Sequence, residues 1–324
     1  MTGPSSRKPA SPVAMVADIG GTNARFALVG EDGGVGDIRV LPCRDYADPA
    51  AAAEAYLAQV RPEAAPRRAA LGVASAVSED RVELTNSAWS FSIEETRRRL
   101  GLDALNVVND MVALALALPH LDDTQRAAIG DGQAIPGAAM AAVAPGTGLG
   151  VGALSPHGTS WAPVASEGGH APLAVRDDYE TAILAILRRR FGHVSAERVL
   201  SGPGLVNLYQ ALCELNGVAA NPEMTPAAVT EGGSRGDCPQ CSEALRLFSA
   251  MLGGFAGSMA LVFCARGGIF IGGGVVRHLG TAFDGAAFRR RFVDMGRFTD
   301  YLAATPTYLV THPTPALIGL AHAV

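Results

Sequence analysis

Short apolar runs alternate with amphipathic stretches along most of this 324-residue chain, and two of the runs end in the same kind of glycine-rich turn. The run 13–17 leads into Asp18-Ile19-Gly20-Gly21-Thr22-Asn23, and the run 140–144 leads into Gly146-Thr147-Gly148 about 125 residues further on. Another apolar segment follows each turn. The pattern predicts two β-hairpins with glycine at their tips. Because glycine lets a ligand approach the backbone and free N–H groups form an anion-binding nest, a duplicated phosphate cradle is indicated.

Helical periodicity and capping residues predict most of the remaining elements. Ser92 and Glu95 form a capping box at the start of a helix that ends before Gly101. Further helices are predicted at 50–60, 111–118, 178–191, 204–216, 242–265 and 315–322, and further strands at 69–74, 82–84, 105–108, 267–271 and 307–310. A hairpin begins the chain and is followed by helices and strands, and a second hairpin is again followed by helices and strands. This order indicates an α/β architecture of two related halves.

The composition excludes several classes of protein. The net charge of −5 gives no sign of a nucleic-acid-binding surface. The longest apolar stretch, 251–265, falls short of the roughly 20 residues that span a bilayer, so a buried helix and no membrane partner are predicted. The residues 1–12 are rich in Pro, Ser and Ala and lack the apolar core of a secretory signal, so we expect a disordered leader. Five scattered cysteines indicate reduced thiols and a cytoplasmic protein.

Lysine is almost absent, since the chain has only Lys8, in the leader. The P-loop proteins, the protein kinases and the Schiff-base enzymes each need a lysine in the site. All three classes are therefore excluded. An enzyme of this sequence that uses ATP must hold it with backbone amides, hydroxyl groups, arginine and Mg²⁺.

Cys238-Pro239-Gln240-Cys241 has the spacing of metal ligands, but the sequence has no second motif to complete the set. An ordinary loop is therefore favoured over a structural zinc site.

The run Gly146–Gly152 also resembles a loose dinucleotide-binding fingerprint, and Glu167 lies about 20 residues further on, where a ribose-binding carboxylate would stand. That fingerprint demands a helix directly after the glycines. Here an apolar strand follows, and Ser155-Pro156-His157-Gly158 is predicted to turn the chain back. A doubly wound dinucleotide-binding fold is therefore disfavoured.

A series of segments resembles, in order and over residues 14–322, the bacterial glucokinases of the actin/hexokinase-like ATPase superfamily. They are the phosphate motif 17–25, the dipeptide Asn109-Asp110, the second phosphate motif 146–150, Ser166-Glu167-Gly168-Gly169-His170, the segment 195–209 and the glycine segment 267–276. Ser166 stands where the family has glycine, which removes no ligand. The cysteine-rich zinc motif of the related ROK sugar kinases and repressors does not occur in the sequence, which favours the glucokinase branch.

The resemblance implies an α/β fold of two lobes, the actin/hexokinase-like ATPase fold with RNase H-like duplicated domains and a cleft between the lobes. The expected small domain comprises 13–118 and 311–324, and the expected large domain comprises 119–310. The implied activity is the ATP-dependent phosphorylation of D-glucose to glucose 6-phosphate, a step of glycolysis, with MgATP and glucose as ligands. A cytoplasmic homodimer is implied as well.

The resemblance also assigns ligand contacts. The nucleotide is expected to be held by Ala17, Asp18, Ile19, Gly20, Gly21, Thr22, Asn23, Gly146, Thr147, Gly148, Gly272, Gly273 and Gly274. Glucose is expected to be held by Asn86, Asn109, Glu167, His170 and Glu197. Asp18 would hold Mg²⁺ through water, or it would only close the turn as an Asx residue. The triple glycine at Gly272–Gly274 would let adenine lie on bare backbone, or it is only a tight turn between a strand and a helix. Arg25 would reach phosphate, or it is a solvated strand residue.

Asp110 is predicted to be the general base. It follows a buried strand and precedes a helix, and an aspartate with an ordinary pKa of about 3.9 is ionised at neutral pH. It could take the proton from the primary hydroxyl of the sugar as the γ-phosphoryl group arrives in line. The alternative is that Asn109-Asp110 only caps the following helix.

The sequence also has to be weighed against other functions. A kinase for fructose, mannose or an amino sugar would share every motif. A sugar-responsive regulator would need a DNA-binding domain, and the segment before Asp18 is too short for one. A chaperone-like or actin-like ATPase would leave Glu167, His170 and Glu197 unexplained.

Overall fold

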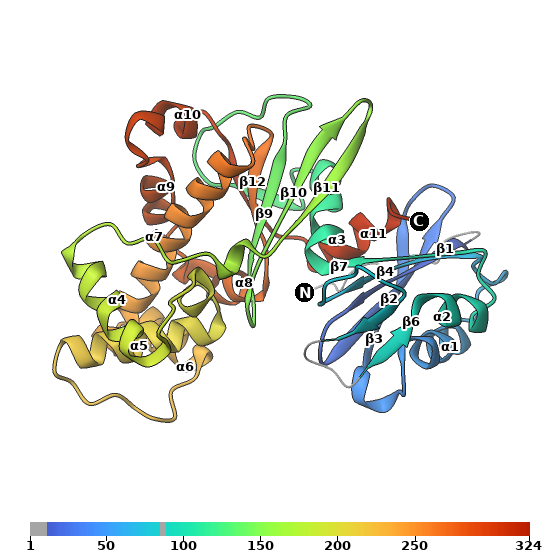
Figure 1. Ribbon diagram of the computed structural model, residues 1–324, viewed down its shortest axis with the longest axis horizontal. Coiled ribbons are helices and arrows are strands. Elements are labelled where there is room, and N and C mark those ends of the chain that lie inside the picture. The colour runs from blue at the N-terminus through green and yellow to red at the C-terminus, as the bar shows by residue number, and fades with distance from the viewer. Residues whose placement is uncertain (1–11, 85–88) are drawn as a thin grey trace. The chain divides into compact units, whose positions relative to one another are not determined.

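The computed structural model describes residues 12–84 and 89–324, and these divide into two compact units (Figure 1). Unit 1 comprises the chain up to Leu121 together with His312–Val324, and unit 2 comprises Asp122–Thr311. The expected leader lies almost entirely outside the described residues, and so does Asn86.

Within its described residues, unit 1 contains a five-stranded sheet in the order β3-β2-β1-β4-β7. Its strands are β1 (Pro12–Ile19), β2 (Asn23–Gly30), β3 (Val35–Pro42), β4 (Arg68–Val73) and β7 (Ala104–Asn109), and a small second sheet pairs β5 (Arg81–Glu83) with β6 (Ser90–Ser92). Strand β2 is antiparallel to both β1 and β3, whereas β1, β4 and β7 run parallel to one another. Parallel strands end at the same edge of a sheet, and this places the glycine turn after β1 beside the ends of β4 and β7.

Helices cover both faces of this sheet (Figure 1). The helices are α1 (Pro49–Val60), α2 (Ile93–Arg99), α3 (Asp110–Ala117) and α11 (Pro315–Ala321), with short 3₁₀ turns at Cys43–Asp45 and Leu118–His120. Tyr56 of α1 packs in the core on one face, and Ala113 of α3 and Leu320 of α11 pack on the other. A Cβ atom on Gly319 would overlap the carbonyl oxygen of Ala113, so glycine is required for α11 to lie this close to α3. The C-terminal helix therefore holds the helix that begins at Asp110.

Unit 2, in the part of the chain described, contains a six-stranded sheet in the order β11-β10-β9-β12-β13-β8. The strands are β8 (Arg126–Ala128), β9 (Met140–Pro145), β10 (Leu149–His157), β11 (Ser160–Ser166), β12 (Gly268–Ile271) and β13 (Thr307–Val310). Strands β11, β10 and β9 are antiparallel, and β9, β12 and β13 are parallel. This arrangement of the first five strands repeats that of unit 1, which confirms the two related halves inferred from the glycine turns.

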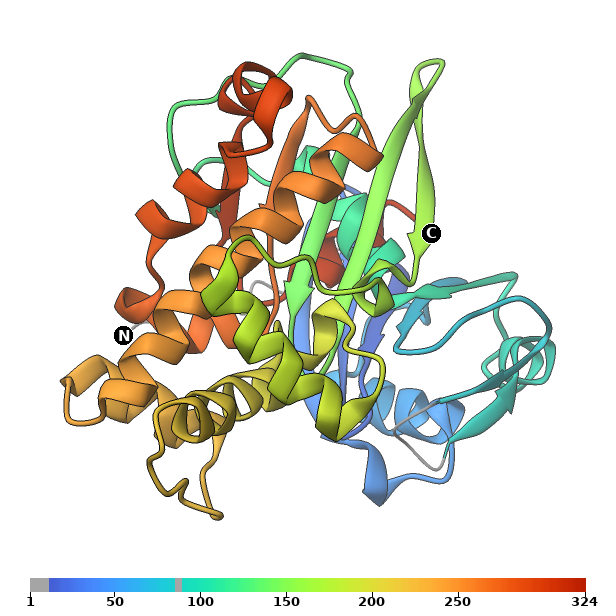
Figure 2. The same ribbon diagram turned by 60° about the vertical axis from the view of Figure 1, so that its left-hand side comes forward.

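The helices of unit 2 form one core with the sheet. They are α4 (Asp178–Phe191), α5 (Gly202–Leu215), α6 (Pro226–Arg235), α7 (Pro239–Val262), α8 (Gly274–Leu279), α9 (Gly285–Val293) and α10 (Thr299–Ala303), with 3₁₀ turns at Gly168–His170, Ala196–Arg198, Gly280–Ala282 and Gly296–Phe298. Helix α7, orange in Figure 2, contacts α5, α6 and α9. Gly253 and Gly257 of α7 lie so close to the carbonyls of Phe288 and Phe292 of α9 that a Cβ atom would overlap them.

Helix α7 corrects one expectation from the sequence. It begins at Pro239 rather than at 242, because the side chain of Cys238 caps it, and it is 24 residues long. Among the described helices it is the one with the length and composition to cross a membrane, but 67% of its most apolar window is buried inside the protein. It is therefore the core helix of unit 2.

Other differences concern short or exposed elements. The reversal predicted at 155–158 occurs only at its end, because β10 continues to His157 and the chain turns at Gly158 before β11 begins at Ser160. Strands β3, β6, β8 and β11 and helices α6, α9 and α10 were not predicted.

Candidate active site

The residues predicted for the site in unit 1 follow the ends of its parallel strands. The register aligns Ile19 of β1 with Val73 of β4, and Val73 with Asn109 of β7. The Nδ2 group of Asn109 donates a hydrogen bond of 3.2 Å to the carbonyl of Ser75, just beyond β4. The glycine turn and Asn109-Asp110 therefore lie at one edge of one sheet.

The turn between β1 and β2 presents amides at this edge. The carbonyl of Asn23 accepts a hydrogen bond of 3.0 Å from Gly20 N–H, and that of Thr22 accepts one of 2.8 Å from Cys43 N–H. The thiol of Cys43 donates to the carbonyl of Gly20 at 3.4 Å. Among the described residues, the N–H groups of Gly21 and Thr22 find no acceptor. Such a pair of free amides suits a phosphate oxygen.

Asp18 precedes this turn and is paired with Arg25 across the hairpin. The Arg25 Nη1 to Asp18 Oδ2 distance is 3.2 Å, and 21% of the Asp18 side-chain surface is exposed. Burial raises the pKa of Asp18 from its usual value, and the charge of Arg25 acts in the opposite direction. Arg25 thus forms an ion pair with Asp18, and 40% of its side-chain surface remains exposed. A single carboxylate beside free amides fits Mg²⁺ bound through water, because this ion keeps several waters and is usually held by one or two carboxylates and the substrate phosphates.

Asn109 and Asp110 divide the capping role that the sequence left open. Asn109 is the N-cap of α3, and its Oδ1 accepts a hydrogen bond of 2.8 Å from Met111 N–H. Asp110 is the first helical residue, and its Oδ1 lies 2.8 Å from the same N–H. Because Asn109 caps the helix by itself, the carboxylate of Asp110 is not required for that purpose.

In unit 2 the second glycine turn joins β9 to β10. Gly146 N–H donates to the carbonyl of Gly148 at 2.8 Å, and Gly202 N–H, at the start of α5, donates to that of Gly146 at 2.8 Å. A Cβ atom on Gly146 would meet no described atom within 4 Å, and Thr147 is exposed. Backbone hydrogen bonds therefore fix this turn, while Gly146 has free space around its Cβ position and Thr147 is exposed. A phosphate-binding turn needs both properties.

The glycines after β12 pack against this turn. Gly272 N–H donates to the carbonyl of Val143 at 2.9 Å. Gly273 has a φ of +84°, and a Cβ atom there would overlap the carbonyl oxygen of Pro145. The tight-turn interpretation thus holds for Gly273. Gly274 differs, because the contact of a Cβ atom there with the rest of the described protein would be an ordinary one, 3.9 Å from Nδ1 of His278.

Three of the predicted sugar-binding residues meet in unit 2. The distances from His170 Nε2 to Glu167 Oε2 and from His170 Nδ1 to Glu197 Oε1 are both 3.9 Å. Glu167 and His170 are mostly exposed, whereas 30% of the Glu197 side chain is exposed. The other oxygen of Glu197 accepts a hydrogen bond of 3.0 Å from Leu149 N–H, directly after the glycine turn. The carboxylate that faces His170 is therefore oriented by the backbone that follows the second glycine turn.

Gly148→Ala is expected to raise the KM for glucose about 10-fold, the cost of roughly one hydrogen bond. A Cβ atom on Gly148 would lie 2.5 Å from Glu197 Oε2, so the carboxylate must leave Leu149 N–H. Steady-state kinetics with glucose as the varied substrate measure the change. Gly285→Ala is the matched control, because Gly285 begins α9 outside the candidate site and a Cβ atom there would make only an ordinary contact of 3.6 Å with Ile129. It should leave the KM for glucose within about twofold, and equal effects of both variants would contradict the role of Glu197.

Sequence reasoning missed several groups that position these residues. Ser166 Oγ accepts a hydrogen bond of 2.9 Å from Gly168 N–H, so the serine in place of glycine shapes the loop before His170. Cys43 and the backbone of Leu149 were not considered either. The backbone carries no sequence signal, and Ser166 was noticed only as a replacement for glycine that removes no ligand, not as a hydrogen-bond acceptor.

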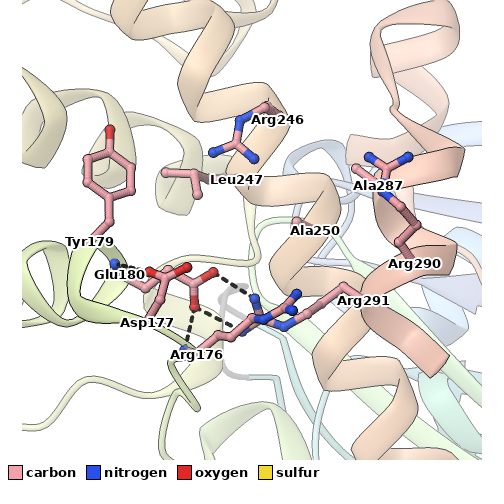
Figure 3. A pocket seen from close by; sticks show the side chains of 10 residues that line it. All are labelled: Arg176, Asp177, Tyr179, Glu180, Arg246, Leu247, Ala250, Ala287, Arg290 and Arg291. Atoms are coloured by element: carbon pink, nitrogen blue, oxygen red, sulfur yellow. Dashed lines mark hydrogen bonds and ion pairs between the residues drawn. The ribbon is translucent and has the colours of Figure 1, made fainter. Parts of the chain in front are cut away.

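A separate cavity of about 150 Å³ lies between α4, α7 and α9, and Figure 3 shows its lining. It is lined by Arg176, Asp177, Tyr179, Glu180, Arg246, Leu247, Ala250, Ala287, Arg290 and Arg291. The residues predicted for the active site are absent from this set. Glu180 is 3% exposed and makes bonds of 2.8 and 2.9 Å to Arg291, so the cavity surrounds an ion pair that joins α4 to α9.

Comparison with known proteins identifies the family. The family model described as Glucokinase matches residues 15–324. The glucokinase of Paramagnetospirillum magneticum is 50% identical over 312 residues, which cover 96% of this chain and 97% of the relative. The chain belongs to the glucokinase family. A crystal structure of a glucokinase from an Antarctic psychrotroph is 37% identical, with a TM-score of 0.88 over 96% of this chain and 98% of that one.

The glucokinase family also accounts for the fold. A ROK family glucokinase from Streptomyces griseus, solved in complex with glucose and AMPPNP, shares 18% identity and a TM-score of 0.64 over 96% of this chain and 98% of that one. The resemblance and the actin/hexokinase-like ATPase fold inferred from the sequence are thus confirmed. The dinucleotide-binding alternative is wrong, because β10 and not a helix follows Gly148.

Proposed function

We propose that this chain transfers the γ-phosphoryl group of ATP to the 6-hydroxyl group of D-glucose, forming ADP and glucose 6-phosphate. Membership of the glucokinase family supports this assignment. The observation that carries it is the meeting of Glu167, His170 and Glu197 beside the second glycine turn. Carboxylates and an imidazole placed together can accept from and donate to several hydroxyl groups of one sugar.

The proposed reaction assigns positioning to most of the site, because phosphoryl transfer needs little covalent chemistry from the protein. The free amides of Gly21 and Thr22 and the open turn at Gly146 would hold phosphate oxygens. Asn109 would contribute a sugar contact through its second N–H, since its first donates to Ser75. The proposal for Asn86 rests on the resemblance alone.

Mg²⁺ is proposed to accompany ATP near Asp18. When bound, the ion would neutralise charge on the phosphates. Among the described residues there is no group of three or more His, Cys, Asp or Glu arranged to hold a metal, which agrees with an ion held mainly by phosphates and water. The protein's part is a carboxylate kept close to the turn by Arg25.

Asp110 is proposed to act as the general base. It would accept the proton of the 6-hydroxyl group as the bond to phosphorus forms, while the β-phosphate oxygen leaves with ADP. We further propose that the enzyme serves glycolysis as a cytoplasmic homodimer, and size-exclusion chromatography with light scattering tests the dimer.

A coupled assay for glucose 6-phosphate tests the assignment. We expect product only when glucose, ATP and Mg²⁺ are all present, and its loss after chelation of Mg²⁺. Glucose-independent hydrolysis of ATP would favour a non-sugar ATPase, and faster turnover of fructose, mannose or an amino sugar would favour another hexose kinase.

Deoxy analogues of glucose are expected to lose about 10- to 100-fold in kcat/KM for each hydroxyl group that the site contacts. The missing hydroxyl leaves a desolvated partner such as Glu197 unsatisfied, which costs about 1–3 kcal/mol. The same coupled assay, with the 2-, 3- and 4-deoxy sugars as substrates, provides the values. Equal use of glucose and all three analogues would contradict a polar sugar pocket.

A further inference from the structure

The cysteine pair before α7 has a defined geometry that the proposed kinase activity does not use. Cys238 is the N-cap of α7, and Cys241 is the third residue of the helix. The Sγ atom of Cys238 accepts a hydrogen bond of 3.2 Å from Cys241 N–H. This is the arrangement in which an N-cap side chain folds back over the first helical turn, and it brings the two thiols together.

Both cysteine side chains pack against Gly232 of α6. A Cβ atom on Gly232 of α6 would lie 3.4 Å from Cys238 Cβ and 3.5 Å from Cys241 Sγ. The thiol of Cys238 is half-buried and that of Cys241 is buried. Cys238 is therefore the more accessible residue of the pair.

A metal site is the alternative for a pair of this spacing. A structural zinc site needs four ligands, commonly cysteine and histidine. In the described ranges no group of three or more His, Cys, Asp or Glu is placed to bind a metal. The pair itself thus offers sulfur–sulfur chemistry rather than half of a zinc site.

We propose that Cys238 and Cys241 form a reversible disulfide within the first turn of α7 when the protein meets a hydroperoxide. The chemical class of the co-reactant is a small peroxide, ROOH. The product is a disulfide that links the cap to the helix, and a dithiol reductant restores the pair.

The reaction proceeds in two balanced steps. The thiolate of Cys238 attacks one peroxide oxygen, the O–O bond breaks, and Cys238 becomes a sulfenic acid while ROH leaves with a proton. The sulfur of Cys241 then attacks the sulfur of Cys238, and the hydroxyl group leaves as water with the proton of Cys241. Two thiols are oxidised by two electrons, and one peroxide is reduced to ROH and water.

The order of attack follows from the positions of the two sulfur atoms. Cys238 is partly exposed at the N-cap of α7, whereas Cys241 is buried one turn further on, so a solute meets Cys238 first. Burial raises the pKa of the Cys241 thiol to about 12, so this group stays protonated and acts second. Its neighbours are Cys238 and the thiol of Cys213 on α5.

Peptide mapping of the intact protein tests the proposal. Trypsin cleaves after Arg235 and Arg246 and releases the peptide 236–246, in which Cys238 and Cys241 are the only cysteines. After graded treatment with hydrogen peroxide and alkylation of free thiols, we expect this peptide to appear unalkylated and about 2 mass units lighter than its dithiol form. Dithiothreitol should restore two alkylation sites. The exposed Cys264 serves as the internal reference for oxidation.

Three variants test the role of each cysteine in the proposed reaction. Cys238→Ser should abolish the bridge and keep the fold, because serine is a good N-cap. Cys241→Ser should leave a sulfenic acid on Cys238 that dimedone traps, and Cys213→Ser should leave the bridge intact. The proposal is overturned if both thiols of the wild-type peptide remain alkylatable at a dose that oxidises Cys264 fully, if Cys213 is one of the bridged residues, or if the protein purifies with stoichiometric zinc that protects the pair. None of these readouts depends on kinase activity.

Discussion

Asp110→Asn is expected to lower kcat for glucose phosphorylation by about 10²- to 10⁴-fold, the usual contribution of a general base. The amide keeps the shape of the side chain and removes its ability to accept the proton. The KM values for glucose and ATP should change little, because Asp110 is proposed to act on the reacting proton and not to hold the ground state. Steady-state kinetics with the coupled assay supply both parameters.

The structure provides a reason to expect an intact fold in this variant. Asn109 caps α3 by itself, and the close packing of Gly319 against Ala113 holds the helix from the other side. Asp103 gives a matched control, because it precedes the same strand that Asp110 follows. It is exposed and paired with Arg67. Asp103→Asn should keep kcat within about twofold, and an Asp110→Asn enzyme with near-normal kcat would remove Asp110 from the role of base.

The sequence predicted the site best where backbone geometry dictates residue type. The glycine segments could be found because close approach requires glycine at Gly148, against Glu197, and at Gly273, against Pro145. The ends of the parallel strands could be found because an apolar run followed by a polar pair, as at Asn109-Asp110, is a strong boundary signal. These features are local, so a single sequence carries them.

Several peripheral strands and helices were missed because their hydrophobic and polar residues do not follow a clear strand or helix period. Strand β11 is an edge strand whose residues are mostly exposed and include Pro163, which is typical of sheet edges. Helix α6 contains Gly232 and Gly233, which lower helix propensity but allow the close approach of α7. In both places tertiary packing outweighs local preference.

The arrangement of Glu167, His170 and Glu197 could not be derived from their spacing in the sequence. Glu167 and His170 are three residues apart, but Glu197 joins them only because the 3₁₀ turns at Gly168–His170 and Ala196–Arg198 come together. The bond from Leu149 N–H to Glu197 spans 48 residues and involves the backbone. The resemblance assigned all three side chains to the sugar, whereas the structure adds the hydrogen bond that ties Glu197 to the end of the second glycine turn.

Arg291→Ala is expected to lower the free energy of unfolding by about 3–5 kcal/mol, the usual cost of leaving a buried charge without its partner. The Arg291 and Glu180 side chains are 12% and 4% exposed, and two hydrogen bonds of 2.8 and 2.9 Å join them (Figure 3). Glu180 Oε2 also accepts from Arg176 N–H at 2.7 Å. Without Arg291, the carboxylate keeps one neutral donor and must either bind a proton or draw water into the α4–α9 contact. Urea unfolding followed by circular dichroism measures the loss.

Arg246→Ala is the control for that variant, because Arg246 lines the same cavity but pairs with Glu243 in an exposed position. Exposed pairs contribute about 0–1 kcal/mol, so its loss should be small. Replacing both partners, as in Glu180→Leu with Arg291→Met, should recover much of the stability, because no buried charge is left. Recovery should stay incomplete, since Arg176 N–H loses its acceptor. If Arg291→Ala costs no more than Arg246→Ala, water already compensates Glu180, and the pair does not hold α4 to α9.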